Sequence, residues 1–317
     1  MDEACSEAIL MGVNLSRSTV YFFKHNDMAD LRLILASIAE DDVANRRDST
    51  QQRRFIVVEG IYRNTGAICP LKELIELKEQ YKYRLILDES LSFGVLGASG
   101  RGITEHFHLP PDAVEILTIA MDCSLASVGG VCVGTREIVD HQRLAGAGYC
   151  FSAAAPPFLS AVAIATLDEL QRSSAAVDSL RKLVPRFHTM LEKVRGLTRL
   201  SSCSTCTPVV HLVFAERIGD PQEEEERMRT LETTLLRRGV AACSPTYPPD
   251  AKSRLLKSST FCYRPSLRLL LHAQLTDADL TFAISVLQSA VDKVLLPPKS
   301  PGAVGDRGDD SRRIPNQ

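Results

Sequence analysis

The chain has 317 residues, of which 44% are hydrophobic and 24% are charged. This length and composition are typical of a globular protein with one large domain or two smaller ones. The 37 basic residues nearly balance the 39 acidic ones, and the formal net charge is −2. A nucleic-acid partner would require a basic excess, so this class is disfavoured. The sequence contains no run of 18 consecutive apolar residues and therefore predicts no membrane-spanning helix.

Strand-like and helix-like segments alternate in the first half of the chain. Asp27 is placed to cap a helix that runs to about Glu40, and Pro70 starts a second helix with apolar residues on one face. Short apolar runs predict strands at residues 20–23, 54–60, 84–88, 116–121 and 130–134. This alternation predicts an α/β fold with a mostly parallel sheet, and ligands bind at the carboxyl ends of such strands.

The second half begins near Pro156 with a long helical stretch, which we expect to be interrupted near Val177 and kinked at Pro185. Strands at 208–214, 240–243 and 267–272 and helices at 221–238 and 276–296 follow. We therefore predict three parts, namely a partial large domain (1–155), a smaller α+β domain (156–296) and a disordered, Pro- and Gly-rich tail (297–317).

The nine cysteines are scattered and mostly lie among apolar residues, as is typical of buried free thiols. One Cys-x-x-Cys motif, Cys203 to Cys206, has no second pair beside it. A structural zinc site requires four ligands, so we predict no metal site.

The most informative motif begins where a predicted strand ends at Asp88. In pyridoxal-phosphate enzymes of the aspartate-aminotransferase fold, a strand-end Asp pairs with the pyridine nitrogen of the cofactor. The α-oxoamine synthase branch reads Asp-Glu-x-His-Ser-x-Gly-x-Leu-Gly here, followed by Gly-Arg-Gly. The chain resembles this branch at Asp88, Glu89, Ser92, Gly94, Leu96, Gly97, Gly100, Arg101 and Gly102, whereas Leu91 replaces the His. The alternative is an acidic pair on a surface loop.

Other landmarks of that branch are missing. The lysine that binds the cofactor covalently lies about six residues before a Gly-Gly pair, and Cys123 occupies that position, or Asp122 if the spacing is one residue longer. No lysine occurs between Lys82 and Lys182. Ser6 replaces the His that stacks on the cofactor ring. The resemblance therefore implies an inactive cofactor site on an intact scaffold.

A longer set of segments narrows the resemblance to the non-catalytic first-subunit family of eukaryotic serine palmitoyltransferase. The similarity covers roughly residues 1–296 and is carried by residues 23–31, 54–60, 89–97, 104–106, 125–127, 140–144 and 148–153. It implies a pyridoxal-phosphate-dependent transferase fold of type I, with a partial large domain and a smaller α+β carboxyl-terminal domain.

The resemblance also implies a function within a complex. The enzyme condenses L-serine with palmitoyl-CoA to 3-ketosphinganine, the first step of sphingolipid biosynthesis. A catalytic long-chain-base subunit holds the pyridoxal 5'-phosphate, and small activating and regulatory membrane subunits join the pair. The alternatives are a self-sufficient pyridoxal-phosphate acyltransferase of the same fold and a non-enzymatic regulatory fragment.

Four residues receive roles by this resemblance. Ser152, with Phe151 beside it, matches the motif whose hydroxyl reaches the cofactor phosphate of the neighbouring subunit, or else it caps the next helix. Asp88 is a relic of the cofactor site that pairs locally. Arg268 falls at the position of the arginine that binds the substrate carboxylate, or is a solvated strand-edge residue. No catalytic residue is expected on this chain, because Cys123 occupies the lysine position.

The family's first subunit begins with a membrane-anchoring helix and an amino-terminal segment of the large domain. We expect this chain to correspond to an amino-terminally truncated form. Its location would then be the cytosolic face of the endoplasmic reticulum membrane, reached through the complex.

Overall fold

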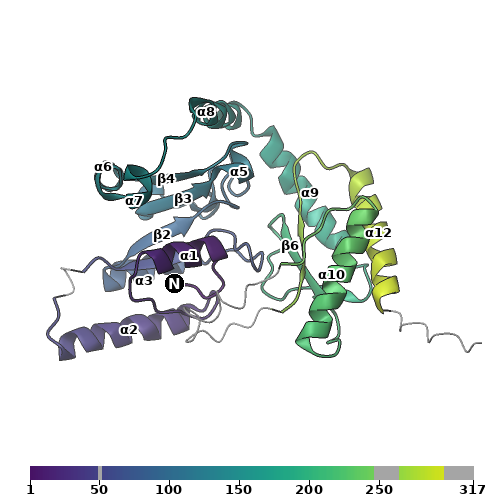
Figure 1. Cartoon of the computed structure of the whole chain (residues 1–317), viewed down its shortest axis with the longest axis horizontal. Coiled ribbons are helices and arrows are strands. Elements are labelled where there is room, and N and C mark those ends of the chain that lie inside the picture. The colour runs from purple at the N-terminus through teal and green to yellow at the C-terminus, as the bar shows by residue number, and fades with distance from the viewer. Residues whose placement is uncertain (49–51, 246–263, 296–317) are drawn as a thin grey trace, which may run out of the picture.

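The computed structural model describes residues 1–48, 52–245 and 264–295, and these form two sheets with surrounding helices (Figure 1). The first region contains α1 (Glu7–Leu15), α2 (Met28–Ala44), β1 (Phe55–Glu59), α3 (Leu71–Tyr81), β2 (Arg84–Asp88), α4 (Ile103–His106), η2 (Pro111–Ala113), β3 (Ile116–Ala120), α5 (Met121–Ser124) and β4 (Gly130–Gly134). The chain continues with α6 (Arg136–Ala145), α7 (Ala147–Cys150) and α8 (Pro157–Arg172), which lie beside the larger sheet (Figure 1). The second region comprises α9 (Ala175–Leu191), β5 (Leu197–Arg199), β6 (Val209–Phe214), α10 (Pro221–Arg237), β7 (Leu267–Leu270) and α12 (Asp277–Leu295).

The larger sheet has the strand order β1-β2-β3-β4. The first three strands are parallel and β4 is antiparallel, which confirms the predicted α/β class with a mostly parallel sheet. Val58, Leu85 and Leu87 are completely buried within it. The register pairs Glu59 with Asp88 and Asp88 with Thr118, so polar residues of three neighbouring strands meet at one edge.

Local sequence signals explain the helices that cover this sheet. The Asp27 side chain accepts hydrogen bonds from the first N–H groups of α2, as its position predicts. In α3, Leu71, Leu74 and Leu77 recur at helical spacing and are buried in the core formed with the sheet. Lys82 ends α3 in the left-handed conformation.

Two predicted strands do not form. Residues 20–23 make only an isolated bridge between Asp2 and Phe23, and residues 240–243 make only a bridge between Cys243 and Arg268. The predictions are wrong because apolar composition alone does not make a strand. A strand also requires a neighbour that continues the ladder of hydrogen bonds, and here the pairing stops after one bridge.

The smaller sheet is antiparallel, with the order β5-β6-β7. It packs against helices α9, α10 and α12 around a separate hydrophobic core (Figure 1). The predicted interruption of the long helical stretch is confirmed, and it lies at residues 173–174, between the end of α8 and the start of α9, a few residues before Val177. Pro185 lies inside α9. The predicted tail at 297–317 lies outside the described residues, and the division at residue 155 stays a prediction.

Gly66 joins the two regions. It adopts a φ of +70°, and a Cβ atom at this position would lie 2.4 Å from the Val209 carbonyl oxygen. The Gly66 carbonyl accepts hydrogen bonds from the Thr207 hydroxyl (2.9 Å) and the Ser204 N–H (3.1 Å). Only glycine combines this conformation with such a close approach. The loop after β1 is therefore fixed against the start of β6.

Candidate functional site

A hollow of about 400 Å³ lies at the carboxyl edge of the larger sheet. This is the edge at which parallel α/β sheets bind ligands. Residues from β1 to β4, their following loops and the start of α1 line it, namely Ser6, Ala8, Glu59, Arg63, Asp88, Ser90, Leu91, Thr118, Ile119, Ala120, Gly129, Gly130, Val131 and Cys132.

Asp88 ends β2 and is half-buried in this hollow. Its Oδ2 accepts a hydrogen bond from the Thr118 hydroxyl (2.8 Å), and its Oδ1 accepts one from the Ser90 N–H (3.0 Å). Both carboxylate oxygens therefore already have a protein donor. The pairing of Asp88 is therefore local, and its role as a relic of a cofactor site stays a prediction.

Glu59 ends β1 and is only 2% exposed. Its carboxylate accepts hydrogen bonds from the backbone N–H groups of Ser6 and Arg63, the latter at 2.8 Å. Burial is the largest of the effects that together raise the pKa of Glu59 to about 7; the charge of Asp88 acts in the same direction, and the hydrogen bonds from Arg63 and Ser6 act against it. Sequence reasoning missed Glu59 and Arg63, because nothing within β1 or the following loop marks them as site residues.

Three positions of the predicted cofactor site are brought close to this hollow. Ser6 and Leu91, which replace two family histidines, both line it. Cys123 lies at its border on α5, where its sulfur is 3.9 Å from Nη2 of Arg63. Desolvation raises the pKa of the Cys123 thiol, so the sulfur is protonated at neutral pH.

These side chains do not fit a covalently held pyridoxal phosphate. A covalent link to the cofactor requires a primary amine, and no lysine among the residues that the structure describes lines the hollow. In addition, both oxygens of Asp88 are already engaged with Thr118 and Ser90. We therefore derive no chemical step through that cofactor on this chain.

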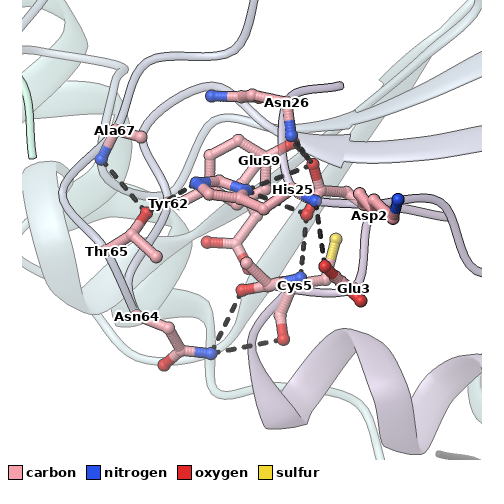
Figure 2. A network of polar contacts seen from close by, with 12 residues as sticks. Asp2, Glu3, Cys5, His25, Asn26, Glu59, Tyr62, Asn64, Thr65 and Ala67 are labelled. Atoms are coloured by element: carbon pink, nitrogen blue, oxygen red, sulfur yellow. Dashed lines mark hydrogen bonds and ion pairs between the residues drawn. The ribbon is translucent and has the colours of Figure 1, made fainter. Parts of the chain in front are cut away.

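A buried polar network holds the segment before α1 in place (Figure 2). Asp2 is completely buried and accepts hydrogen bonds from the Tyr62 hydroxyl (3.0 Å) and the Asn26 N–H (2.9 Å), with His25 Nδ1 also at 3.0 Å. Asn64 donates to the carbonyl oxygens of Ala4 and Cys5. The segment before α1 is thus fixed to the loop after β1, at the wall of the hollow.

Comparison with known proteins identifies the family. Residues 2–287 match the family described as aminotransferase class I and II. The chain belongs to this family. It is 38% identical over 295 residues to long chain base biosynthesis protein 1b of Oryza sativa subsp. japonica, and 34% identical over 298 residues to serine palmitoyltransferase 1 of Dictyostelium discoideum. These relatives confirm the predicted resemblance.

The matches cover 93% of this chain in both cases, but only 58% of the rice protein and 60% of the Dictyostelium protein. A solved serine palmitoyltransferase from Sphingomonas wittichii superposes with a TM-score of 0.75 at 22% identity, covering 92% of this chain and 66% of that chain. This structural similarity shows that the chain has the fold of a serine palmitoyltransferase.

The two residues predicted to reach a partner lie away from the hollow and are exposed. Phe151 follows α7 with 89% of its surface accessible. Ser152 is also exposed, and its hydroxyl donates to the Gly148 carbonyl. It makes no cap on α8, whose first residue is preceded by Pro156 and receives no side-chain cap. The alternative that Ser152 caps that helix is therefore wrong.

Arg268 lies on β7 and is half-buried. Its Nη2 is 3.9 Å from the Cys243 sulfur, and its buried Nε has no hydrogen-bond partner among the described residues. It does not line the hollow. Its neighbour in register, His211, bonds to the Ser266 hydroxyl and donates to the Arg63 carbonyl, each at 2.9 Å. Burial lowers the pKa of His211 to about 4.

Proposed function

We propose that the chain is a non-catalytic subunit of a serine C-palmitoyltransferase. The complex condenses L-serine with palmitoyl-CoA to 3-ketosphinganine, the first step of sphingolipid biosynthesis. Two observations together carry this proposal. The chain is 34–41% identical to proteins named for this enzyme or for long-chain-base biosynthesis, and no lysine lines the hollow in the described part of the chain. The chain would thus support a catalytic partner.

Pyridoxal 5'-phosphate, bound by the partner, supplies an electron sink for the reacting amino acid. The contribution of this chain is structural and positional. Glu59 and Asp2 hold the walls of its own hollow, and the loop at residues 151–152 extends outward from α7. A serine hydroxyl is a suitable donor to a phosphate oxygen across a subunit interface. Arg268 is proposed as a weaker candidate, for the carboxylate of the amino-acid substrate.

The exposed surface of helices α6 to α8 is an argument for a protein partner. No residue of α6 or α7 is buried, and Ala163 is the only buried residue of α8. Large apolar side chains are exposed here, namely Leu144, Tyr149, Phe151, Phe158, Ile164 and Leu167. Exposed apolar side chains of this size mark protein interfaces. We assign this surface, called the α6–α8 surface, to the catalytic long-chain-base subunit.

The proposal extends to the setting of the complex. We infer that small activating and regulatory membrane subunits join the pair, and that the assembly works at the cytosolic face of the endoplasmic reticulum membrane. Among the described residues, no helix is long and apolar enough to cross a bilayer. We propose that the other subunits attach the pair to the membrane. Cell fractionation tests this: when those subunits are removed, we expect this chain to leave the membrane fraction.

Complementation tests the proposal. The chain is co-expressed with a catalytic long-chain-base subunit in cells that lack the first subunit, and 3-ketosphinganine is measured. We expect activity, and a fall of roughly tenfold for Ser152→Ala, the loss of one charge-assisted hydrogen bond to phosphate. Ser285→Ala is the matched control, because this exposed hydroxyl on α12 also donates to a backbone carbonyl, that of Phe282.

Two outcomes contradict the proposal. The first is an inactive pair in cells where a full-length first subunit restores activity. The second is activity of the purified chain without a partner, which would favour the self-sufficient acyltransferase instead. Co-purification of the two chains without any activity would favour a regulatory fragment.

A further inference from the structure

The Cys-x-x-Cys motif of the sequence lies in the connection between β5 and β6. Both of its cysteines are free thiols, but they differ in accessibility, because Cys206 is exposed and Cys203 is only 8% exposed. The Cys203 sulfur lies against the backbone, 3.4 Å from the Val209 carbonyl oxygen. Redox-active cysteine pairs often have this spacing.

The same connection holds the two regions of the chain together. Gly66, in the loop after β1, accepts hydrogen bonds from the Ser204 N–H (3.1 Å) and the Thr207 hydroxyl (2.9 Å). A Cβ atom on Gly66 would lie only 3.0 Å from the Cys203 sulfur, so this sulfur packs against the joint itself. Buried His188 of α9 holds the other side, because its Nε2 donates to the Thr207 carbonyl at 3.3 Å.

The two thiols also differ in reactivity. Burial raises the pKa of the Cys203 thiol, which keeps this sulfur protonated and unreactive while it stays in its shielded position. Cys206 is accessible to solvent, so a dissolved oxidant meets this sulfur first. Cys203 is then the nearest cysteine along the chain, two residues away, that is able to resolve the product.

We propose that Cys203 and Cys206 form a reversible disulfide that loosens the joint at Gly66. The oxidant is a small-molecule disulfide. The Cys206 sulfur attacks one of its sulfurs, which forms a mixed disulfide and releases one thiol. The Cys203 sulfur then attacks the Cys206 sulfur and displaces the second thiol, and the protons of both cysteines pass to the two thiolates that leave. Two cysteine thiols are thus oxidised, and one small-molecule disulfide is reduced to two thiols.

Closure of this disulfide changes the groups that hold Gly66. The two sulfurs must approach to about 2 Å with a fixed dihedral angle. One sulfur is buried and the other is exposed, so the connection has to rearrange before they meet. Ser204 lies inside the ring that closes, and its N–H is one of the two donors to the Gly66 carbonyl. Oxidation therefore releases the loop after β1, which carries Arg63 into the hollow.

Peptide mass spectrometry on the purified full chain tests the proposal, with oxidised glutathione as the oxidant. We expect a disulfide between Cys203 and Cys206 that dithiothreitol removes. Hydrogen exchange of the backbone amides at residues 62–67 should become roughly tenfold faster on oxidation, because local opening becomes easier, and should return to its initial rate on reduction.

Two variants keep this result interpretable. Cys206→Ser changes an exposed side chain and should prevent both the disulfide and the faster exchange, with circular dichroism to show that it is folded. Cys150→Ser removes another exposed thiol, on α7, and should leave both effects unchanged. The buried Cys203 is retained in every variant.

Four outcomes overturn the proposal. Cys206 stays reduced, Cys206 ends as a mixed disulfide with glutathione, or the disulfide forms while exchange at residues 62–67 stays the same. The fourth is equally faster exchange in oxidised Cys206→Ser, which would place the effect at another cysteine. The proposal goes beyond the subunit function and needs neither a partner nor palmitoyl-CoA, so its failure is separable from failure of that function.

Discussion

The hollow at the sheet edge and the α6–α8 surface differ in whether their side chains find partners within this chain. Around the hollow, Asp2, Glu59 and Asp88 each have two or more hydrogen-bond donors from elsewhere in the chain. On the α6–α8 surface, large side chains such as Phe151 and Leu144 are 89% and 83% exposed. The side chains of the first region are held by contacts within this chain, whereas those of the second bury little apolar area here and would stabilise only a complex that covers them.

We expect the largest loss of stability from a substitution in the polar network that holds the segment before α1. Asp2→Ala removes the acceptor of the Tyr62 hydroxyl and the Asn26 N–H, and leaves these groups unsatisfied. We expect the free energy of unfolding to fall by about 3 kcal/mol, since each unsatisfied buried group costs roughly 1–3 kcal/mol. Urea denaturation measures it, with Asp41→Ala, an exposed acidic residue on α2, as the control. A loss of less than 1 kcal/mol would show that the network contributes little stability.

The next effect is a pH dependence from Glu59. The folded chain holds this proton more tightly than the unfolded chain, because the pKa rises from 4.5 to about 7 on folding. The contribution of Glu59 to the free energy of unfolding is therefore largest below pH 4.5 and is lost as the pH rises through 7. The loss amounts to about 3 kcal/mol.

Comparison of the wild type with Glu59→Gln isolates this contribution, because the other groups titrate in both proteins. Urea denaturation at pH 5 and pH 8 should give a smaller fall in stability for the variant. His211 acts in the opposite direction below pH 6.5, since its pKa is lowered to about 4 by burial. Equal slopes for both proteins would mean that Glu59 is solvated rather than buried.

We expect the smallest change in the stability of the free chain from a substitution on the α6–α8 surface. Phe151→Ala should change the free energy of unfolding by less than about 0.5 kcal/mol, because the ring contacts mainly solvent. It should nevertheless weaken co-purification with a catalytic subunit roughly tenfold. Phe282→Ala is the control, since this ring on α12 is 51% exposed and lies outside the surface. Equal retention of the partner by both variants would move the interface elsewhere.

Much of the fold could be predicted from local patterns. Asp27 caps α2 because a short carboxylate can reach the N–H groups of the first turn, which requires no distant contact. The strand ending at Asp88 is visible from its apolar run and the glycines after it. The false strand at residues 20–23 has equally apolar residues, but its pairing with the segment before α1 stops after one bridge.

The candidate site was only partly predictable, for a similar reason. Asp88, Ser6 and Cys123 could be placed because each belongs to a motif in which neighbouring residues fix the spacing. Glu59 and Arg63 could not, since their roles arise from an N–H group 53 residues away and from charges on other strands. No local pattern records such distances.

The sequence by itself determined the family, the alternation of strands and helices, and the lack of a lysine where a covalent cofactor would need one. These properties depend on residue type and on short spacings. The tertiary structure alone decided that two carboxylates and Arg63 share one hollow, and that the apolar side chains of α6 to α8 remain exposed. Burial and charge pairing depend on contacts between segments far apart in the chain, and these exist only once the sheets have formed.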